Sequence, residues 1–173
     1  MSMNEKEMNA WVERYEAFYK AHPECPQSEA IESMNLIMKR TYAEAIKSGK
    51  KTVEFRAYSP HYCDRLYDKK VDRYIEMHKN EEETQKMLEE GIITPMRIVR
   101  NIHFHNYNNS WHLDCECIQN GVIALCKEDV QMLQEQFGCH ELDKDLAAFE
   151  ARGEKDRPLL FYFAIGQIGD NNL

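Results

Sequence analysis

The chain has 173 residues, 43% of them hydrophobic and 30% charged, which predicts one domain with its own core, or one domain with a terminal extension. No apolar run approaches the roughly 20 residues that a membrane-spanning helix needs, and the N-terminal region lacks the basic and apolar parts of a secretory signal, so we expect a cytoplasmic protein with no membrane partner. The net charge of −8 disfavours binding to double-stranded DNA and leaves nucleic-acid recognition only through a local basic cleft or a single base.

The N-terminal region is predicted to be helical. Apolar residues recur every three or four positions from Asn4 to Ala21, which is typical of an amphipathic helix, and His22-Pro23 ends it. Ser28 is expected to cap a short helical turn through Glu32. Residues 1–32 are therefore predicted to form a helical extension of a main domain that spans residues 33–173.

The main domain is predicted to open with a strand and a short helix. The apolar run Asn35 to Met38 indicates a buried strand, although one longer helix from Ser28 to Lys47 is an alternative. Thr41 and Glu44 have the spacing of a capping box, and Tyr42 and Ile46 would form the inner face of the helix. Ser48-Gly49 is expected to end it.

A turn at Gly49, Lys50 and Lys51 leads into a predicted strand from Thr52 to Arg56. Alternation along a strand separates a polar face from an apolar face. The polar face holds Thr52, Glu54 and Arg56, and the apolar face holds Val53 and Phe55. This pattern is compatible with a binding or catalytic surface, and also with the ordinary solvated face of an edge strand, where ion pairs contribute about 0 to 1 kcal/mol.

The next segments are predicted as a loop, a strand and a helix. Residues Ala57 to Lys70 are polar and are interpreted as a loop over the site. The alternation from Val71 to Met77 favours a strand. Asn80 and Glu83 have the spacing of a capping box for a helix that Gly91 closes.

Residues Ile93 to Ile123 are interpreted as a three-stranded antiparallel meander. A two-residue turn at Asn108-Asn109 would pair Tyr107 with Ser110, His105 with His112 and His103 with Asp114. The predicted apolar face holds Ile98, Ile102, Phe104, Trp111, Leu113, Cys115 and Cys117. The predicted polar face holds Asn101, His103, His105, His112, Asp114 and Glu116. Asn120-Gly121 indicates a second hairpin.

The C-terminal third is predicted to contain two helices and a strand. The helices are expected from Glu128 to Phe137 and from Leu142 to Arg152, as an insertion over residues 128–152. The run Pro158 to Gly166 is apolar enough for a central strand, and Gly169 to Leu173 is expected to fray. The predicted fold class is α+β, with about six largely antiparallel strands that could curl into a small barrel.

The short helix that leads into Gly49-Lys-Lys-Thr-Val-Glu-Phe-Arg56, followed by a hairpin and an aromatic strand, resembles the ASCH family of the PUA-like β-barrel superfamily. The motif residues are Gly49, Lys51, Thr52, Glu54 and Arg56, and the similar region runs from Asn35 to about Ile168. The resemblance implies a small, largely antiparallel PUA-like β-barrel with flanking helices and a cleft suited to RNA or modified nucleosides. Some relatives in this family are amidohydrolases that deacetylate N-acetylated cytidine, and others are linked to RNA cleavage.

Binding of RNA or a nucleoside is the first functional hypothesis. Arg56 and Lys51 would contact phosphate or a base edge, Glu54 would accept from an exocyclic amine, and a tyrosine would stack on the base. The candidate ligand-binding residues are Gly49, Lys50, Lys51, Thr52, Glu54, Arg56, Tyr58 and Tyr74, with Tyr62 as a further stacking candidate. No cofactor is expected.

Two other hypotheses stay open at this point. In a hydrolase acting on an acylated nucleoside or RNA, Glu54 would be a general base or Lys51 an activated amine, with Arg56 steadying negative charge. In a metal-binding protein, the polar face of the meander would supply imidazole and carboxylate ligands. The candidate metal ligands are His103, His105, His112 and Asp114.

Overall fold

A computed structural model describes residues 3–173 and has an α+β architecture of seven helices and a five-stranded mixed sheet. The described chain divides into two compact units. The first unit contains residues up to Glu29 together with Arg65–Arg97, and the second contains Ala30–Asp64 together with Ile98–Leu173. The two units are described separately below.

In the first unit, three helices share one apolar core. They are α1 (Glu5–Ala21), α4 (Lys69–His78) and α5 (Glu82–Glu89). Helix α1 begins near Asn4, as predicted. The structure adds a capping box, in which the Asn4 side chain accepts from Glu7 N and the Glu7 carboxylate accepts from Asn4 N. Trp11, Tyr15 and Tyr19 of this helix pack against the core residues, which are Phe18, Cys25, Val71, Tyr74, Met87, Ile92 and Ile93.

The predicted strand at Val71–Met77 is wrong, because these residues belong to α4. The Asp68 side chain accepts from the backbone N–H groups of Lys70 and Val71 and so caps the helix. The inward-facing residues are then Val71 and Tyr74, at helical spacing, whereas Met77 is exposed. The period-two pattern was a coincidence of residue types on a helix.

Three further predictions about where helices begin are wrong. Ser28 does not begin a helical turn, since residues 26–30 have no regular secondary structure, strand β1 begins at Ile31, and Ser28 Oγ donates to Thr94 O. Helix α5 begins after Glu81 without a side-chain cap, so the predicted Asn80 capping box is absent. The loop predicted over Ala57 to Lys70 contains α3 (Pro60–Leu66) and the start of α4.

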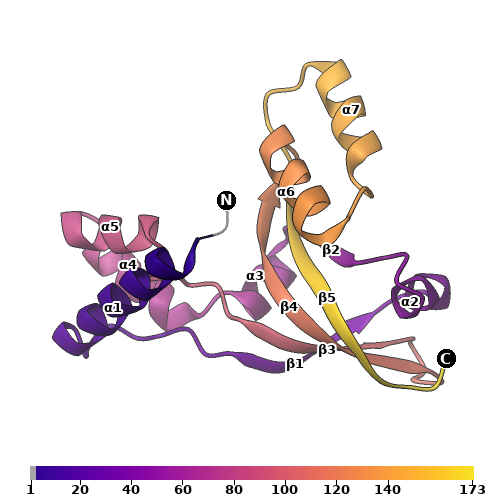
Figure 1. The fold of residues 1–173 in the computed structure, drawn as a ribbon, viewed down its shortest axis with the longest axis horizontal. Coiled ribbons are helices and arrows are strands. Elements are labelled where there is room, and N and C mark those ends of the chain that lie inside the picture. Colours follow the sequence, from indigo (N-terminus) through magenta and orange to yellow (C-terminus); the bar gives the residue numbers. More distant parts are fainter. Residues whose placement is uncertain (1–2) are drawn as a thin grey trace. The chain divides into compact units, whose positions relative to one another are not determined.

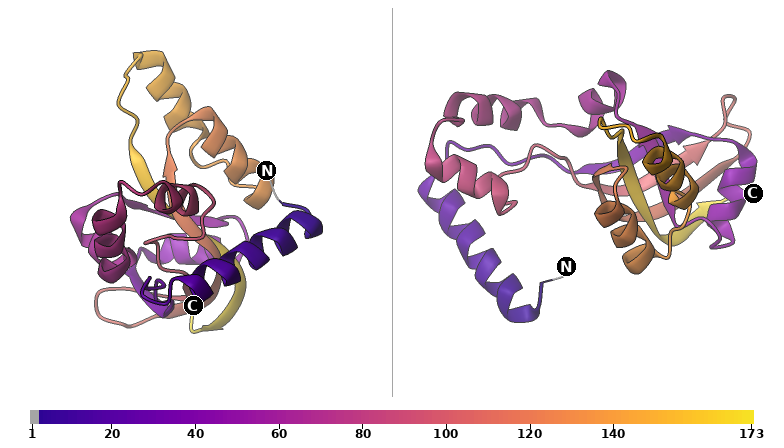
Figure 2. Two further views of the ribbon diagram at one scale, coloured as in Figure 1. Left: turned by 90° about the vertical axis from the view of Figure 1, so that its left-hand side faces the viewer. Right: turned by 90° about the horizontal axis from the view of Figure 1, so that it is seen from above.

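In the second unit, the sheet consists of β1 (Ile31–Ile37), β2 (Val53–Ala57), β3 (Val99–His105), β4 (His112–Ala124) and β5 (Leu159–Asn171). The order is β1-β3-β4-β5-β2, and only the β1–β3 pair is parallel. Strands β4 and β5 pair along their whole length and curve together (Figures 1 and 2). The strand alternative for Asn35 to Met38 is therefore correct, and the single long helix is wrong.

The sheet is not closed into a barrel, which corrects the barrel expectation. Its edge strands β1 and β2 pair only with β3 and β5, respectively. The predicted hairpin at Asn120-Gly121 is also wrong, because β4 continues through it and Gly121 pairs with Tyr162. The Asn120 side chain accepts from Val99 N instead of shaping a turn. The C-terminal segment does not fray at Gly169, since β5 extends to Asn171.

The remaining helices of the second unit are α2 (Arg40–Lys47), α6 (Lys127–Phe137) and α7 (Asp143–Arg152). Helix α2 begins after Lys39, so the predicted Thr41–Glu44 capping box is absent, and Tyr42 is exposed while Ile46 is buried. Helices α6 and α7 lie between β4 and β5 in the chain and end at Phe137 and Arg152, as predicted. The residues that follow, Gly138 and Gly153, have left-handed backbone.

The apolar residues of β2 anchor it against these two helices. Val53 is fully buried and Phe55 packs on the same cluster, which also contains Ile123, Leu125, Val130, Leu133, Phe149 and Tyr162. Glu54 and Arg56, on the other face, lie opposite the buried Phe163 and Phe161 of β5. Among the described helices, none is both long and apolar enough to cross a bilayer.

Candidate functional site

The carboxylate of Glu54 is buried between two cations. Glu54 is 8% exposed, its Oε2 lies 3.3 Å from Arg56 Nη2, and its Oε1 lies 3.8 Å from Lys51 Nζ. The backbone N–H of Phe55 also donates to Oε1, at 2.9 Å. The alternative of an ordinary solvated strand face therefore does not describe Glu54, because its surroundings are protein groups.

Arg56 connects three elements of the second unit. Its Nη1 donates to Tyr62 Oη on α3 at 3.1 Å, and its Nη2 donates to the carbonyl oxygen of Ile37 on β1 at 2.9 Å. Its side chain is only 17% exposed. The guanidinium is therefore held in one orientation by a carboxylate, a hydroxyl and a carbonyl, as the planar fork of arginine allows.

Lys51 links the strand to the connection between α6 and α7. Its ammonium donates to both carboxylate oxygens of Glu141, at 2.8 and 3.0 Å. Its side chain is 11% exposed, whereas that of Glu141 is 39% exposed. Four charged side chains therefore form a row in the order Glu141, Lys51, Glu54 and Arg56. These four residues are called the β2 ion network.

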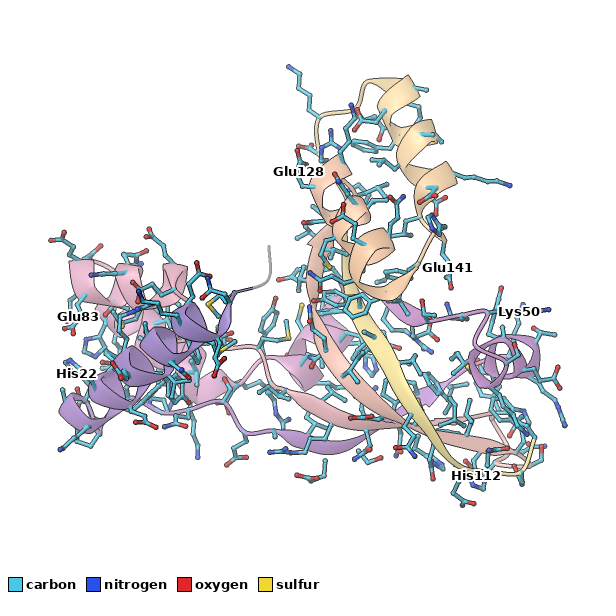
Figure 3. The ribbon with its side chains drawn as sticks, viewed as in Figure 1. His22, Lys50, Glu83, His112, Glu128 and Glu141 are labelled. Carbon is cyan, nitrogen blue, oxygen red and sulfur yellow. The ribbon has the colours of Figure 1, made fainter. Side chains whose placement is uncertain are left out.

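The turn before β2 lies at Gly49, Lys50 and Lys51, as the motif predicts. Gly49 has φ +81°, in the left-handed region, and ends α2. The following Lys50 is exposed and its side chain points away from the sheet (Figure 3). Thr52 is half-buried, and its carbonyl accepts from Ile165 N, which joins it to β5.

The tyrosines proposed as stacking groups have different surroundings. Tyr58 is 43% exposed and stacks on Phe161 with ring centroids 5.0 Å apart, next to the β2 ion network. Tyr62 serves as a hydrogen-bond acceptor for Arg56. Tyr74 belongs to α4 in the other unit, where it is buried and stacks on His78, so it does not offer a ring face to a base.

Sequence reasoning missed Glu141, which lies 90 positions from Lys51 in the chain. No local pattern links the two residues, because the bend between α6 and α7 brings Glu141 to the turn that precedes β2. Arg56 and Ile37 are also brought together only by the tertiary fold, and the sequence had no signal for that bond.

The histidines of β3 and β4 form a second polar cluster. The predicted register is confirmed, with His103 opposite Asp114 and His105 opposite His112. Six residues of the predicted apolar face are buried, whereas Ile98 is exposed. The connecting turn differs, because Asn109 N donates to Asn106 O and so Tyr107 and Asn108 lie at its centre.

In the structure, the carboxylate of Asp170 joins this cluster, whereas the His105 imidazole bonds to the backbone. His103 Nδ1 bonds to Asp114 Oδ1, and His112 Nε2 lies 3.0 Å from Asp170 Oδ2 on β5. His105 Nδ1 instead bonds to Asn106 O at 2.8 Å. Among the described residues, His112, Asp114 and Asp170 each have a possible ligand atom within 4.8 Å of the other two. Asp170 was missed because its segment was expected to fray.

Comparison of the chain with protein-family models, with curated proteins and with solved structures found no match.

Proposed function

We propose that this protein binds a nucleoside or a short single-stranded RNA element at the β2 ion network. The observation that carries the proposal is the burial of Glu54 between Arg56, on the same strand, and Lys51, in the turn before it. The similarity of the Gly49 to Arg56 motif to the ASCH family supports the same function.

The energetics of buried ions support a functional role for this network. Removing a charge from water costs several kcal/mol, and replacing a buried ion pair with apolar residues of similar volume is often neutral or stabilising. Stability alone therefore gives little reason to keep a carboxylate and two cations on β2 and the turn before it, because Val53 and Phe55 already anchor the strand. A site that recognises a polar ligand requires such groups.

The groups present match the edges of a nucleoside. Arginine and lysine donate to a base carbonyl or a phosphate. Tyr58 provides a half-exposed ring on the rigid support of Phe161, and bases stack on such rings in single-stranded recognition. Lys50, exposed on the neighbouring turn, adds local positive charge to a chain whose net charge is −8.

Glu141 is the partner that an anionic ligand would replace. Its side chain is far more exposed than that of Lys51, so its carboxylate can return to water at little cost. The Lys51 ammonium would then meet a phosphate or carbonyl oxygen in the same place. This exchange gives the site a route to ligand binding that leaves the Glu54–Arg56 pair intact.

The geometry favours binding over general-base catalysis by Glu54. Both of its oxygens have donors, since Oε1 accepts from Phe55 N and Oε2 faces Arg56 Nη2. A general base needs an available lone pair directed at the proton that it removes. Hydrolysis of an acylated nucleoside is therefore the second candidate function. Product analysis during the titrations distinguishes it from binding alone.

The proposal is tested by titrating the purified chain with cytidine, N-acetylated cytidine and a short single-stranded RNA by calorimetry, with product analysis of each mixture. We expect saturable binding of at least one probe without turnover. Arg56→Lys keeps the charge but loses the planar fork, and should weaken binding at least tenfold. The matched control is Arg100→Lys, at an exposed arginine paired with Glu32.

Absence of binding by every probe would overturn the proposal, as would equal losses in the Arg56 and Arg100 variants. Turnover that Glu54→Gln abolishes would replace binding with hydrolysis as the function. Circular dichroism of each variant verifies that the fold is retained, so that a loss of binding is assigned to the site.

A further inference from the structure

Away from the β2 ion network, three side chains from two strands place possible metal ligands close together. One ligand atom each from His112, Asp114 and Asp170 lies within 4.8 Å of the others. His112 and Asp114 are partly buried and Asp170 is exposed, and His112 lies at the end of the sheet near the C-terminus (Figure 3). These three residues are called the His-Asp cluster below.

The backbone brings this cluster together in a specific way. The β3–β4 register sets His103 beside Asp114, and a register shift between Leu113 and Cys115 changes the pairing of β4 with β5. Gly169 lies so close to β4 that an added Cβ would be 3.3 Å from the carbonyl oxygen of Asp114. Because Gly169 has no side chain, β5 can pack closely on β4 at this point, next to Asp170.

We propose that His112, Asp114 and Asp170 bind a divalent transition-metal ion, with zinc as the probe. Imidazole nitrogen and carboxylate oxygen are ligands that zinc and its first-row neighbours accept. In a tetrahedral site with bonds of about 2.1 Å, ligand atoms lie about 3.4 Å apart. Two ligand atoms at the full separation of 4.8 Å would therefore have to approach each other by about 1.4 Å. The exposed Asp170 side chain can supply much of this movement by a change of rotamer.

His103 has a positioning role in this site. Its Nδ1 bonds to Asp114 Oδ1, which fixes the carboxylate and leaves the other oxygen for the ion. Hydrogen bonds of this kind to metal ligands typically alter metal affinity by 10- to 100-fold. The His103 and His112 rings stack with centroids 5.6 Å apart, so the two imidazoles hold each other in place.

Three protein ligands leave at least one coordination position open, as in zinc sites that bind water or a substrate. Asp114 also lines a groove of about 580 Å³ whose other polar walls include Asn101, Glu116 and Gln167. A molecule in that groove would therefore lie next to the metal ligand Asp114. The cluster shares no residue with the β2 ion network, so the two proposals succeed or fail independently.

The test is a calorimetric titration of the chelator-treated, untagged protein with zinc chloride, and a parallel cobalt titration followed by its visible absorption. We expect one equivalent of zinc, displacement of cobalt by zinc, and a rise in melting temperature with zinc. His112→Ala and Asp170→Asn should each weaken zinc binding more than tenfold. His103→Ala should have a smaller effect.

The matched control is His140→Ala, which removes an exposed histidine whose Nδ1 is 3.0 Å from Asp143. It should bind zinc as the wild-type chain does. Two results would overturn the proposal: the absence of stoichiometric zinc binding, or unchanged affinity in the His112→Ala, Asp170→Asn double variant. Melting temperatures measured without metal verify that the variants are folded.

Discussion

Arg56 on β2 donates a hydrogen bond to the carbonyl oxygen of Ile37 on β1, so one guanidinium joins the two edge strands of the sheet. The backbones of these edges do not pair, and the sheet stays open. The same guanidinium faces Glu54 and Tyr62. Arg56 is therefore both a structural link in the second unit and the most constrained group of the proposed site.

The ion pair between Glu54 and Arg56 should be energetically coupled. We expect the single variants Glu54→Gln and Arg56→Met each to lower the free energy of unfolding by about 3 kcal/mol, because each leaves a largely buried charge without its partner. The double variant should lose less than the sum, with a coupling energy of about 1 to 3 kcal/mol. Urea denaturation of the four proteins measures this cycle.

The control is the same double-mutant cycle on Arg40 and Glu44, an exposed pair one turn apart on α2. Arg40 Nε lies 3.1 Å from Glu44 Oε1. Its coupling should be about 0.3 to 0.5 kcal/mol. Equal coupling in the two cycles would show that the Glu54–Arg56 pair is effectively solvated, which contradicts its burial in the structure.

Glu141→Gln should increase the affinity for anions at Lys51. The substitution keeps the size of the side chain but removes the charge that lies 2.8 Å from the Lys51 ammonium. Because Glu141 is well exposed, the free energy of unfolding should change by less than about 1 kcal/mol. Titration with a nucleoside monophosphate should show several-fold tighter binding than in the wild-type chain.

Glu135→Gln provides the comparison, since it removes an exposed charge from α6 and leaves Lys51 paired. It should reproduce any effect that arises only from the change in net charge. If both variants bind the monophosphate equally well, Glu141 does not compete with the ligand.

Gly49→Ala should destabilise the protein by about 1 to 2 kcal/mol, because an L-residue with a Cβ is strained at the φ of +81° that this turn requires. Gly49→Asn should cost less, since asparagine tolerates the left-handed conformation. Thermal denaturation measures the order of the three proteins. An alanine variant as stable as the wild type would mean that the turn adopts another conformation.

Stability should fall at alkaline pH because of two buried thiols. Burial raises the pKa of Cys115 from its ordinary value of 9.0 to about 12 and that of Cys117 to about 11. In the unfolded chain these thiols ionise first, so their contribution is complete below about pH 9 and is lost as the pH rises toward 11 to 12. Each thiol adds a slope of up to about 1.4 kcal/mol per pH unit in that range.

Urea unfolding under reducing conditions at about pH 8 and at about pH 10.5 measures this loss. The Cys115→Ala, Cys117→Ala double variant should lose less stability between the two pH values than the wild type. Cys63→Ala, which removes a thiol outside this buried pair, should behave like the wild type. Parallel losses in all three proteins would assign the alkaline instability to other groups.

Local sequence patterns determined several elements and one register. The three- and four-residue spacing of apolar residues predicted α1, and local patterns predicted α6 and α7 with the C-terminal ends that the structure shows. The pairing of His103 with Asp114 was predicted from a turn at Asn108-Asn109 and from alternation. It is confirmed although the turn itself differs, because a shift of one residue would bury charged groups. The polar and apolar faces of β2 followed from the same alternation.

The tertiary structure decided what alternation and turn propensity could not. Val71–Met77 satisfies both a strand period and a helix period, and the Asp68 cap and the core around Tyr74 select the helix. Asn120-Gly121 has the composition of a turn, but pairing with β5 keeps it within a strand. Long-range packing overrides a local preference of about 1 kcal/mol.

Both candidate sites combine a locally predictable strand with a partner from a distant part of the chain. Lys51, Glu54 and Arg56 were readable from one strand and the turn before it, and His112 and Asp114 were readable from another strand. Glu141 and Asp170 were not, because their positions depend on the α6–α7 bend and on the register of β5. The sequence by itself determined which residue types share a strand face, and only the fold decided which charges meet across it, because ionic contacts depend on distances that no local period encodes.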